Sequence, residues 1–334
     1  MIMIRTSIVS DIVADLRQDS MMALESELCR RTGAAHCVLT SGGMQGIILA
    51  LRCAGVKPGD TVICPALGDP SLLHAVLYAG ATPIFSDVNP DTWLLDSFCL
   101  EYTLHKCVRT GQPTPTAVIS GNLFGLPCNY PAIESVCEQY EIALIEDMRR
   151  SLGAGIGERK SGCFGDYSVT LLPGDDGVAC IFCRELESLK RLSAHSKAFA
   201  EPDLIAIEAA HQSIYRLEHD RKERSRVAAE YQNLLGGAVK TQQVKSGYYS
   251  AYNDFVIAFA DEESAAAAGQ RLMEKNLGCD TPLPQKLHKL SEISGGRKVV
   301  LPHAQTIGDK LIALPIHPDM NSKTIAQVAQ IVSG

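Results

Sequence analysis

The order of β-rich runs and helical stretches constrains this chain more than any other feature. Between about residue 20 and residue 200, short apolar runs alternate with stretches that carry a helical pattern, such as 45–53, 71–78 and 130–140. Strands that alternate with helices favour an α/β fold, in which a mostly parallel sheet is covered by helices on both faces. Seven runs predict the strands of this sheet: 36–40, 61–64, 82–86, 116–120, 142–146, 167–172 and 178–183.

The pattern changes after residue 200. A long helical stretch covers 203–235 and ends at Gly236-Gly237, and a strand at 252–259, a helix at 262–275 and a closing helix from Ser322 follow. We therefore expect a large domain of residues 1–235, with an N-terminal arm and a long linking helix, and a smaller α+β domain of residues 236–334.

The charge excludes some function classes. A net charge of -7 without a basic cluster argues against binding to nucleic acid or to an anionic membrane. No run approaches the ~20 apolar residues of a bilayer span, and the N-terminal residues carry acids where a signal peptide would be apolar. These features predict a cytoplasmic protein.

The twelve cysteines lie mostly in apolar runs, which is typical of buried free thiols. Cys180 and Cys183 form a CxxC pair inside the predicted strand 178–183. Because residues three apart in a strand point to opposite faces, we do not expect them to share a metal ion. The sequence predicts reduced thiols and no metal site.

Six segments, taken together, resemble the DegT/StrS family of sugar aminotransferases, which are pyridoxal phosphate (PLP) enzymes of fold type I. They follow the family's order and together extend over most of the chain. The resemblance implies a fold type I aminotransferase-like architecture, a PLP site and a dimer. The segments are SGGMQGIILALRCAGVKPGDTVICPA, AVLYAGATPIFSDVNPDTWLLD, NLFGLP, EIALIEDMRRSLGAGI, SGCFGDYS and ALPIHPDMNSKTIAQV.

The resemblance assigns the cofactor's phosphate to a helix that begins at Gly42, Gly43 and Met44, directly after the strand 36–40. A helix N-terminus favours an anion through its free N–H groups and its dipole. The family usually has a hydroxyl-bearing residue where Gly43 stands, so one donor to the phosphate is missing.

The ring of the cofactor is assigned to three positions. Asp147 matches the acid beside the pyridine nitrogen, which keeps that nitrogen protonated. Arg150 replaces the Gln or His that usually faces the ring, and an Asp147–Arg150 ion pair is a structural alternative. Asp69 stands where an aromatic side chain usually stacks on the ring.

The family's next element is a serine that helps bind phosphate, followed five residues later by the lysine that forms the Schiff base. Ser168 matches the serine, but Pro173 stands at the lysine position and Asp175 and Asp176 follow. None of these side chains can form an imine, so no covalent cofactor is expected. In the family, an asparagine of the partner subunit also contacts the phosphate. In the corresponding region of this chain, the acid Glu201 lies nearest to that position.

Three hypotheses follow. The leading one is a non-catalytic homologue that keeps the fold and dimerises with itself or with an active relative, because the acids repel an anionic cofactor. A second is an enzyme that uses PLP or pyridoxamine phosphate (PMP) noncovalently on a keto sugar, with Asp175 or Asp176 as general base. A third is a binding module whose cleft holds a cationic or neutral small molecule.

Overall fold

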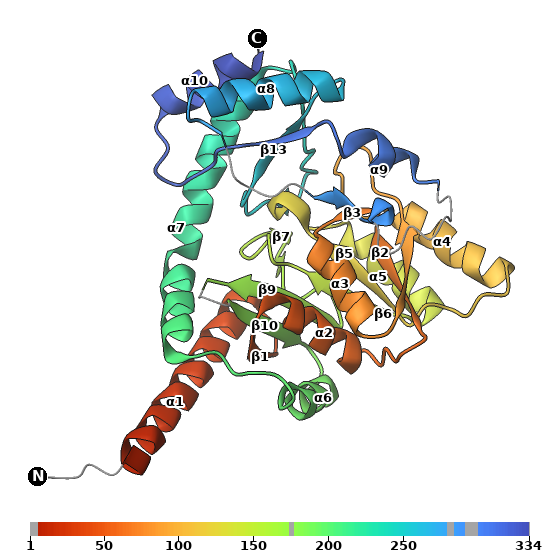
Figure 1. The fold of residues 1–334 in the computed structure, drawn as a ribbon, viewed down its shortest axis with the longest axis vertical. Coiled ribbons are helices and arrows are strands. Elements are labelled where there is room, and N and C mark those ends of the chain that lie inside the picture. The colour runs from red at the N-terminus through yellow and green to blue at the C-terminus, as the bar shows by residue number, and fades with distance from the viewer. Residues whose placement is uncertain (1–5, 174–176, 279–283, 291–299, 334) are drawn as a thin grey trace, which may run out of the picture.

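The computed structural model describes residues 6–173, 177–278, 284–290 and 300–333. Its centre is a seven-stranded sheet in the order β1-β10-β9-β6-β5-β2-β4 (Figure 1). β10 is antiparallel to both of its neighbours, and the other adjacent strands are parallel. The predicted α/β fold and its mostly parallel sheet are confirmed. The strands are β1 (His36–Ser41), β2 (Thr61–Pro65), β4 (Thr82–Ser86), β5 (Ala117–Gly121), β6 (Ala143–Asp147), β9 (Tyr167–Leu172) and β10 (Val178–Cys183).

Helices cover both faces of this sheet. One apolar core lies between the sheet and α2 (Gly43–Cys53), α3 (Pro70–Tyr78) and α6 (Leu186–Ser196). A second core, on the opposite face, contains side chains of α4 (Ser97–Arg109) and α5 (Tyr130–Tyr140).

Strand β10 shows how the sequence divides between the two faces. Ile181 and Cys183 belong to the core under α2, whereas Cys180 and Phe182 belong to a third core under α1 and α7. Cys180 and Cys183 therefore lie on opposite faces, as the spacing predicts. The cysteines that the structure describes are free thiols.

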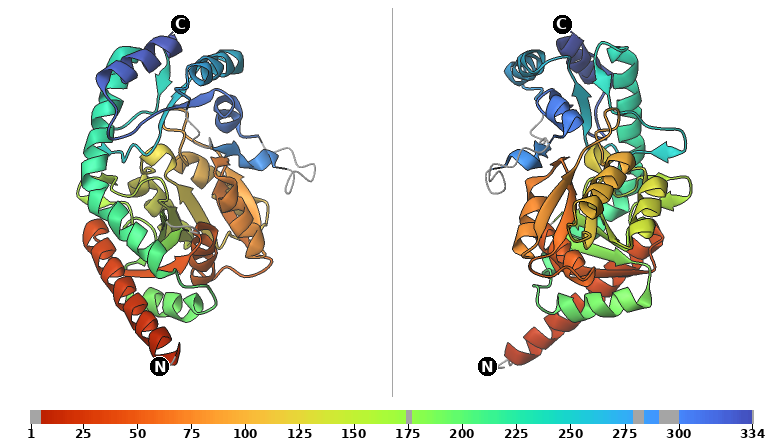
Figure 2. Two further views of the ribbon diagram at one scale, coloured as in Figure 1. Left: turned by 60° about the vertical axis from the view of Figure 1, so that its left-hand side comes forward. Right: turned by 90° about the vertical axis from the view of Figure 1, so that its right-hand side faces the viewer.

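Two long helices pack against each other beside β1 and β10. α1 (Thr6–Thr32) is a continuous helix where the sequence predicts only an arm, and its N-terminal end projects from the body (Figure 2). α7 (Leu204–Leu235) begins after Asp203, whose side chain accepts the N–H of Ala206 at 2.7 Å, and ends at Gly236 with a φ of 50°. α7 runs along the molecule from the large sheet to the C-terminal part (Figure 1).

The C-terminal part contains a three-stranded sheet in the order β11-β13-β15, with α8 (Glu262–Glu274) and α10 (Ser322–Ser333) packed on it. The strands are β11 (Lys240–Thr241), β13 (Phe255–Ala258) and β15 (Leu311–Leu314), and α9 (Pro302–Ile307) precedes β15. The predicted strand, helix and closing helix of this part are confirmed.

Two short segments of the C-terminal part pair with the N-terminal part. β12 (Tyr248–Tyr249) joins β7 (Gly155–Ile156), which also pairs with β8 (Arg159–Lys160). β14 (Gln285–Lys286) joins β3 (Leu67–Gly68). The chain after residue 236 thus contributes to the surroundings of the large sheet, and a clean division at residue 235 stays a prediction. No helix in the described ranges combines the length and apolar character that a bilayer span needs.

Candidate functional site

A cleft of about 620 Å³ lies where β5 and β6 end. In open parallel sheets, ligands bind beyond the carboxyl ends of the strands. The first residues of α3, the turn after β6 and two segments of the C-terminal part complete its walls. Three of the predicted site residues line this cleft: Asp69, Asp147 and Arg150.

The floor of the cleft is an ion pair that the sequence analysis missed. Arg149 donates to both carboxylate oxygens of Asp147, from Nε to Oδ1 at 2.8 Å and from Nη2 to Oδ2 at 2.7 Å. The predicted Asp147–Arg150 pair is therefore wrong. That prediction took its spacing from a helix, but Asp147 ends β6 and a turn follows, so the second residue on, rather than the third, meets the carboxylate.

Helix α3 holds the same guanidinium from the other side. Nη1 of Arg149 donates to Oγ of Ser71 at 2.7 Å, and Asp69 accepts the backbone N–H of Ser71 at 2.8 Å as the N-cap of α3. Burial raises the pKa of Asp69, but Arg149 and the bonds from Ser71 outweigh it, so that the pKa lies below its usual value. The acid predicted to repel a ligand is thus partly neutralised by a neighbouring cation.

Arg150 points to the C-terminal part of the chain. Its Nη1 donates to Oδ1 of Asp254 at 3.3 Å, and the side chain of Asp254 is 4% exposed. Burial raises the pKa of Asp254, although Arg150 and Arg224 act against it. Arg150 therefore joins the turn after β6 to the residue that precedes β13.

The first turn of α2 is covered by an apolar side chain. A Cβ added to Gly43 would lie 2.8 Å from Cδ2 of Leu171, and one added to Gly177 would lie 2.6 Å from Cδ1 of the same residue. The N–H of Gly42 donates to the carbonyl of Gly177 at 3.0 Å. Gly42, Gly43 and Met44 do open a helix, as predicted, but Leu171, and none of the three, lines the cleft.

Ser168 does not reach the cleft, so its assignment to the cofactor pocket is wrong. Its hydroxyl donates to Oε2 of the fully buried Glu146 at 2.7 Å. Successive residues of a strand point to opposite faces, and Ser168 lies opposite the face to which Val169 contributes. Its role is structural in this fold.

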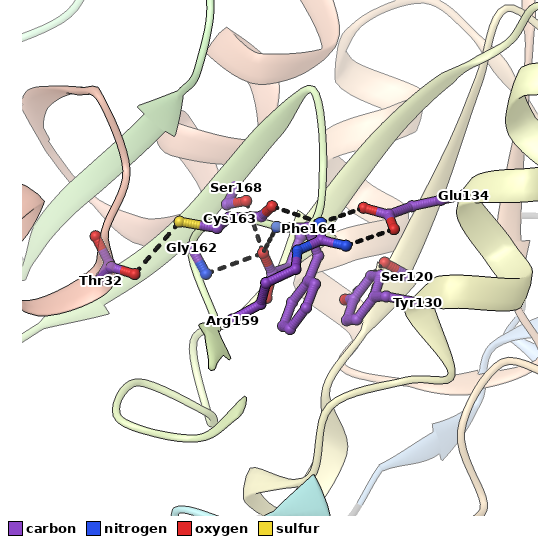
Figure 3. Close-up of polar contacts among 10 residues, drawn as sticks. Thr32, Ser120, Tyr130, Glu134, Arg159, Gly162, Cys163, Phe164 and Ser168 are labelled. Atoms are coloured by element: carbon purple, nitrogen blue, oxygen red, sulfur yellow. Dashed lines mark hydrogen bonds and ion pairs between the residues drawn. The ribbon is translucent and has the colours of Figure 1, made fainter. Parts of the chain in front are cut away.

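Glu146 is the centre of a buried polar network, and Figure 3 labels three of the residues that bond to it, Gly162, Phe164 and Ser168. The backbone N–H groups of Gly162 and Phe164 donate to its Oε2, and Asn122 donates to its Oε1 at 3.0 Å. Burial raises the pKa of Glu146 despite these donors. The network fixes the loop before β9 against the end of β6, and β6 in turn carries Asp147 into the cleft.

The outer edge of this network faces solvent. Figure 3 shows Arg159 beside Phe164 and Glu134, and the guanidinium lies 4.8 Å from the Phe164 ring centre. Nη1 of Arg159 donates to Glu134 at 2.8 Å, and Cys163 donates to the carbonyl of Thr32 at 3.3 Å. These contacts tie the loop 159–164 to α5 and to the end of α1.

The remaining predicted residues lie elsewhere. Glu201 is half exposed and pairs with Arg17 of α1 at 2.7 Å, outside the cleft. Among the lysines, Lys197 caps the C-terminus of α6, is exposed and does not line the cleft. Asp175 and Asp176 lie outside the described residues. Within the described part of the chain, no lysine lines the cleft.

The chain matches one known protein family over most of its length. The DegT/DnrJ/EryC1/StrS aminotransferase family model matches residues 12–170 and 205–333. The chain belongs to this family. The stretch between the two matched regions begins at Leu171, the residue that covers the first turn of α2.

Relatives within the family act on nucleotide sugars. A UDP-N-acetyl-3-dehydro-alpha-D-glucosamine 3-aminotransferase of Acidithiobacillus ferrooxidans is 25% identical over 332 residues, covering 93% of this chain and 87% of the relative. An aminotransferase of the family from Brucella abortus has the same fold, with a TM-score of 0.86, 22% identity and coverage of 98% and 93%. A sugar aminotransferase of Streptococcus pneumoniae, at a TM-score of 0.83, 18% identity and coverage of 94% and 92%, is known in a PLP form. Family members thus use PLP, and the fold type I architecture is shared.

The residues of this cleft do not fit PLP. Both carboxylate oxygens of Asp147, which a pyridinium would need as its acceptor, are already bound by Arg149. The helix N-terminus that would bind a phosphate is covered by Leu171, and the described lining offers no primary amine for a Schiff base. The cleft therefore differs from a PLP site at the ring, at the phosphate and at the point of attachment.

Proposed function

We propose that this protein is a non-catalytic homologue of the PLP-dependent nucleotide-sugar aminotransferases, which keeps their fold and forms no internal aldimine. The observation that carries this proposal is the packing of Leu171 between Gly43 and Gly177. A phosphate at the start of α2 needs open N–H groups, and an apolar side chain there offers it no hydrogen bond. The described residues of the cleft lining include no lysine, which supports the same conclusion.

Covalent trapping tests the proposal. The purified protein is incubated with PLP, reduced with borohydride and digested, and mass spectrometry locates every modified lysine. Because PLP also reacts slowly with surface lysines, a parallel sample contains excess PMP, which protects only a specific site. The Acidithiobacillus relative serves as the positive control. We expect low adduct levels on exposed lysines that PMP leaves unchanged, and a single stoichiometric adduct that PMP prevents would refute the proposal.

A PMP-dependent enzyme is less well supported by the site. Such an enzyme needs the Asp147 carboxylate for the ring nitrogen of its cofactor, and Arg149 already binds both oxygens. Turnover of a nucleotide keto sugar with PMP, lost on Asp147→Ala, would favour this alternative over the non-catalytic one.

The role of a non-catalytic member lies in association. We infer that the protein acts as a subunit, either of a homodimer or of a heterodimer with an active relative, in the cytoplasm where its thiols stay reduced. Light scattering of the protein alone and mixed with the active relative distinguishes these states. A monomer under both conditions would refute the subunit role.

Binding of a small cation is a second candidate function. The described side chains of the cleft include the carboxylates of Asp69, Asp147 and Asp254 but only two guanidinium groups, those of Arg149 and Arg150. This excess of negative charge favours a cationic ligand over an anionic one. A thermal shift screen with small amines and small carboxylates tests this, because only the amines should stabilise the protein.

A further inference from the structure

The side chain that pairs with Asp147 is itself planar, cationic and nearly enclosed. The side chain of Arg149 is 12% exposed and that of Asp147 is 10% exposed. Three of the five N–H donors of the guanidinium are held, two by Asp147 and one by Ser71. Burial lowers the pKa of Arg149, but Asp147 and Asp69 outweigh it and raise the pKa above its usual value.

A protonated pyridine ring and a guanidinium group offer a carboxylate similar chemistry. Both are flat cations whose N–H groups lie in the plane of the group, and the guanidinium cannot lose its proton under ordinary conditions. By its resemblance to the family, Asp147 stands at the position of the acid that keeps the ring nitrogen of the cofactor protonated. Here the cation comes from the residue two positions along the same chain.

We propose that Arg149 is a built-in replacement for the protonated ring of the cofactor, and that it completes the cleft without any bound ligand. This inference rests on the proposed function only in that no cofactor competes for Asp147. As a consequence, the stability of this fold depends on Arg149, which occupies the place that the cofactor takes in the relatives of this protein. Removal of the side chain leaves Asp147 as an enclosed carboxylate without a counter-ion, and it opens a space shaped for a flat cation.

Chemical rescue of Arg149→Ala tests the proposal. Melting temperatures are measured with and without methylguanidinium at about 10 mM, a concentration far below the molar range in which guanidinium denatures proteins. Sodium chloride at equal ionic strength and methylurea, which is flat but neutral, are the controls. Arg17→Ala is the matched variant, because Arg17 also makes an ion pair, with Glu201 at 2.7 Å, but the side chains of Arg17 and Glu201 are 39% and 50% exposed.

We expect Arg149→Ala to melt at least about 4 °C below the unmodified protein. We also expect methylguanidinium, but neither control solute, to recover part of this loss. Arg17→Ala and the unmodified protein should not respond. An unchanged melting temperature for Arg149→Ala, or equal responses to methylguanidinium and methylurea, would overturn the proposal.

Two further variants keep the test informative if Arg149→Ala does not fold. Asp147→Asn/Arg149→Ala removes the carboxylate as well, so it should be folded and should not respond to methylguanidinium. Arg149→Lys keeps the charge but cannot donate to both oxygens side by side, and it should be less stable than the unmodified protein. If the double variant is as unstable as Arg149→Ala, the pairing with Asp147 is not what Arg149 provides. This outcome leaves the proposed function intact, because that proposal is tested separately, by PLP and PMP on the unmodified protein.

Discussion

Arg150, in the turn after β6, donates to Asp254, the residue that precedes β13, at 3.3 Å. The contact links the parallel sheet to the C-terminal part across the cleft. The side chain of Asp254 is 4% exposed, so its carboxylate has little access to water and depends on Arg150, together with Arg224, for charge compensation.

We therefore predict that Arg150→Ala lowers the free energy of unfolding by about 1–2 kcal/mol at neutral pH. Urea denaturation measures the change. The control is a double-mutant cycle with Asp254→Asn: in that background, Arg150→Ala should have almost no further effect. Equal losses in both backgrounds would show that the two side chains are not coupled.

Ser168 provides a test of its structural role. Its hydroxyl is one of four donors to the buried Glu146, and Ser168→Ala leaves one carboxylate oxygen with a missing partner. We expect a loss of about 1–3 kcal/mol in the free energy of unfolding. Ser41→Ala, which removes an exposed hydroxyl, should cost less than about 0.5 kcal/mol. If Ser168 served a ligand instead, the two variants would be similarly stable.

Most of the fold could be predicted from the sequence, because the buried strands of the sheet and the helices that cover its two faces show strong hydrophobic patterns. The run 178–183 predicts a strand, and its alternate residues do enter two different cores. α1 escaped prediction because its central residues do not form a clear apolar stripe: its buried side chains include Leu24 and Leu28, while Val13 and Leu16 are exposed. Such a helix is stabilised by its contact with α7, which local pattern does not reveal.

The candidate site was predicted less completely, because its chemistry depends on contacts between distant segments. Asp147 and Asp69 were found from their positions in the motifs, but the partner of Asp147 depends on the geometry of one turn. The apolar residue over α2 could not be identified from spacing, since Leu171 and Gly43 lie 128 positions apart in the sequence. The Arg150–Asp254 contact spans a similar separation, of 104 residues.

Glu25 gives a prediction for pH. Burial raises its pKa from 4.5 to about 7, although the N–H of Leu39 donates to it. The folded state holds this proton more tightly than the unfolded state, so its contribution to stability is complete below pH 4.5 and is lost as the pH rises to about 7. Glu25→Gln keeps an acceptor for the N–H of Leu39. The free energy of unfolding of this variant, relative to that of the unmodified protein, should rise by up to about 3 kcal/mol between these pH values and should not rise further above them.

Glu27 is the matched control on the same helix. Hydrogen bonds from Arg30 and Arg31 lower its pKa to about 2. The advantage of Glu25→Gln should therefore change between pH 5 and pH 8, whereas the stability difference between Glu27→Gln and the unmodified protein should stay constant. Denaturant titrations at four pH values measure both. A flat profile for Glu25→Gln would contradict the burial of this carboxyl group.

Two glycines of α2 test how the helix meets its surroundings. A Cβ on Gly46 would lie 2.9 Å from Cγ1 of Val169 and 3.0 Å from Cβ of Ala179, both in the core. We predict that Gly46→Ala costs about 1–3 kcal/mol, because neither neighbour can move. Gly43→Ala should cost less than about 1 kcal/mol, because the added methyl group meets the end of the flexible Leu171 side chain, which can shift slightly and still cover the start of α2. Equal costs would contradict the described packing, and thermal denaturation of the two variants decides between them.

Calorimetric titration of the unmodified protein with PLP, and separately with PMP, tests the central claim most directly. With Arg149 on Asp147 and Leu171 over α2, neither compound should give saturable heat at micromolar concentrations, and neither should raise the melting temperature. Stoichiometric binding of either compound that is abolished by Asp147→Ala would show that the cleft still accepts the cofactor, and would contradict this account.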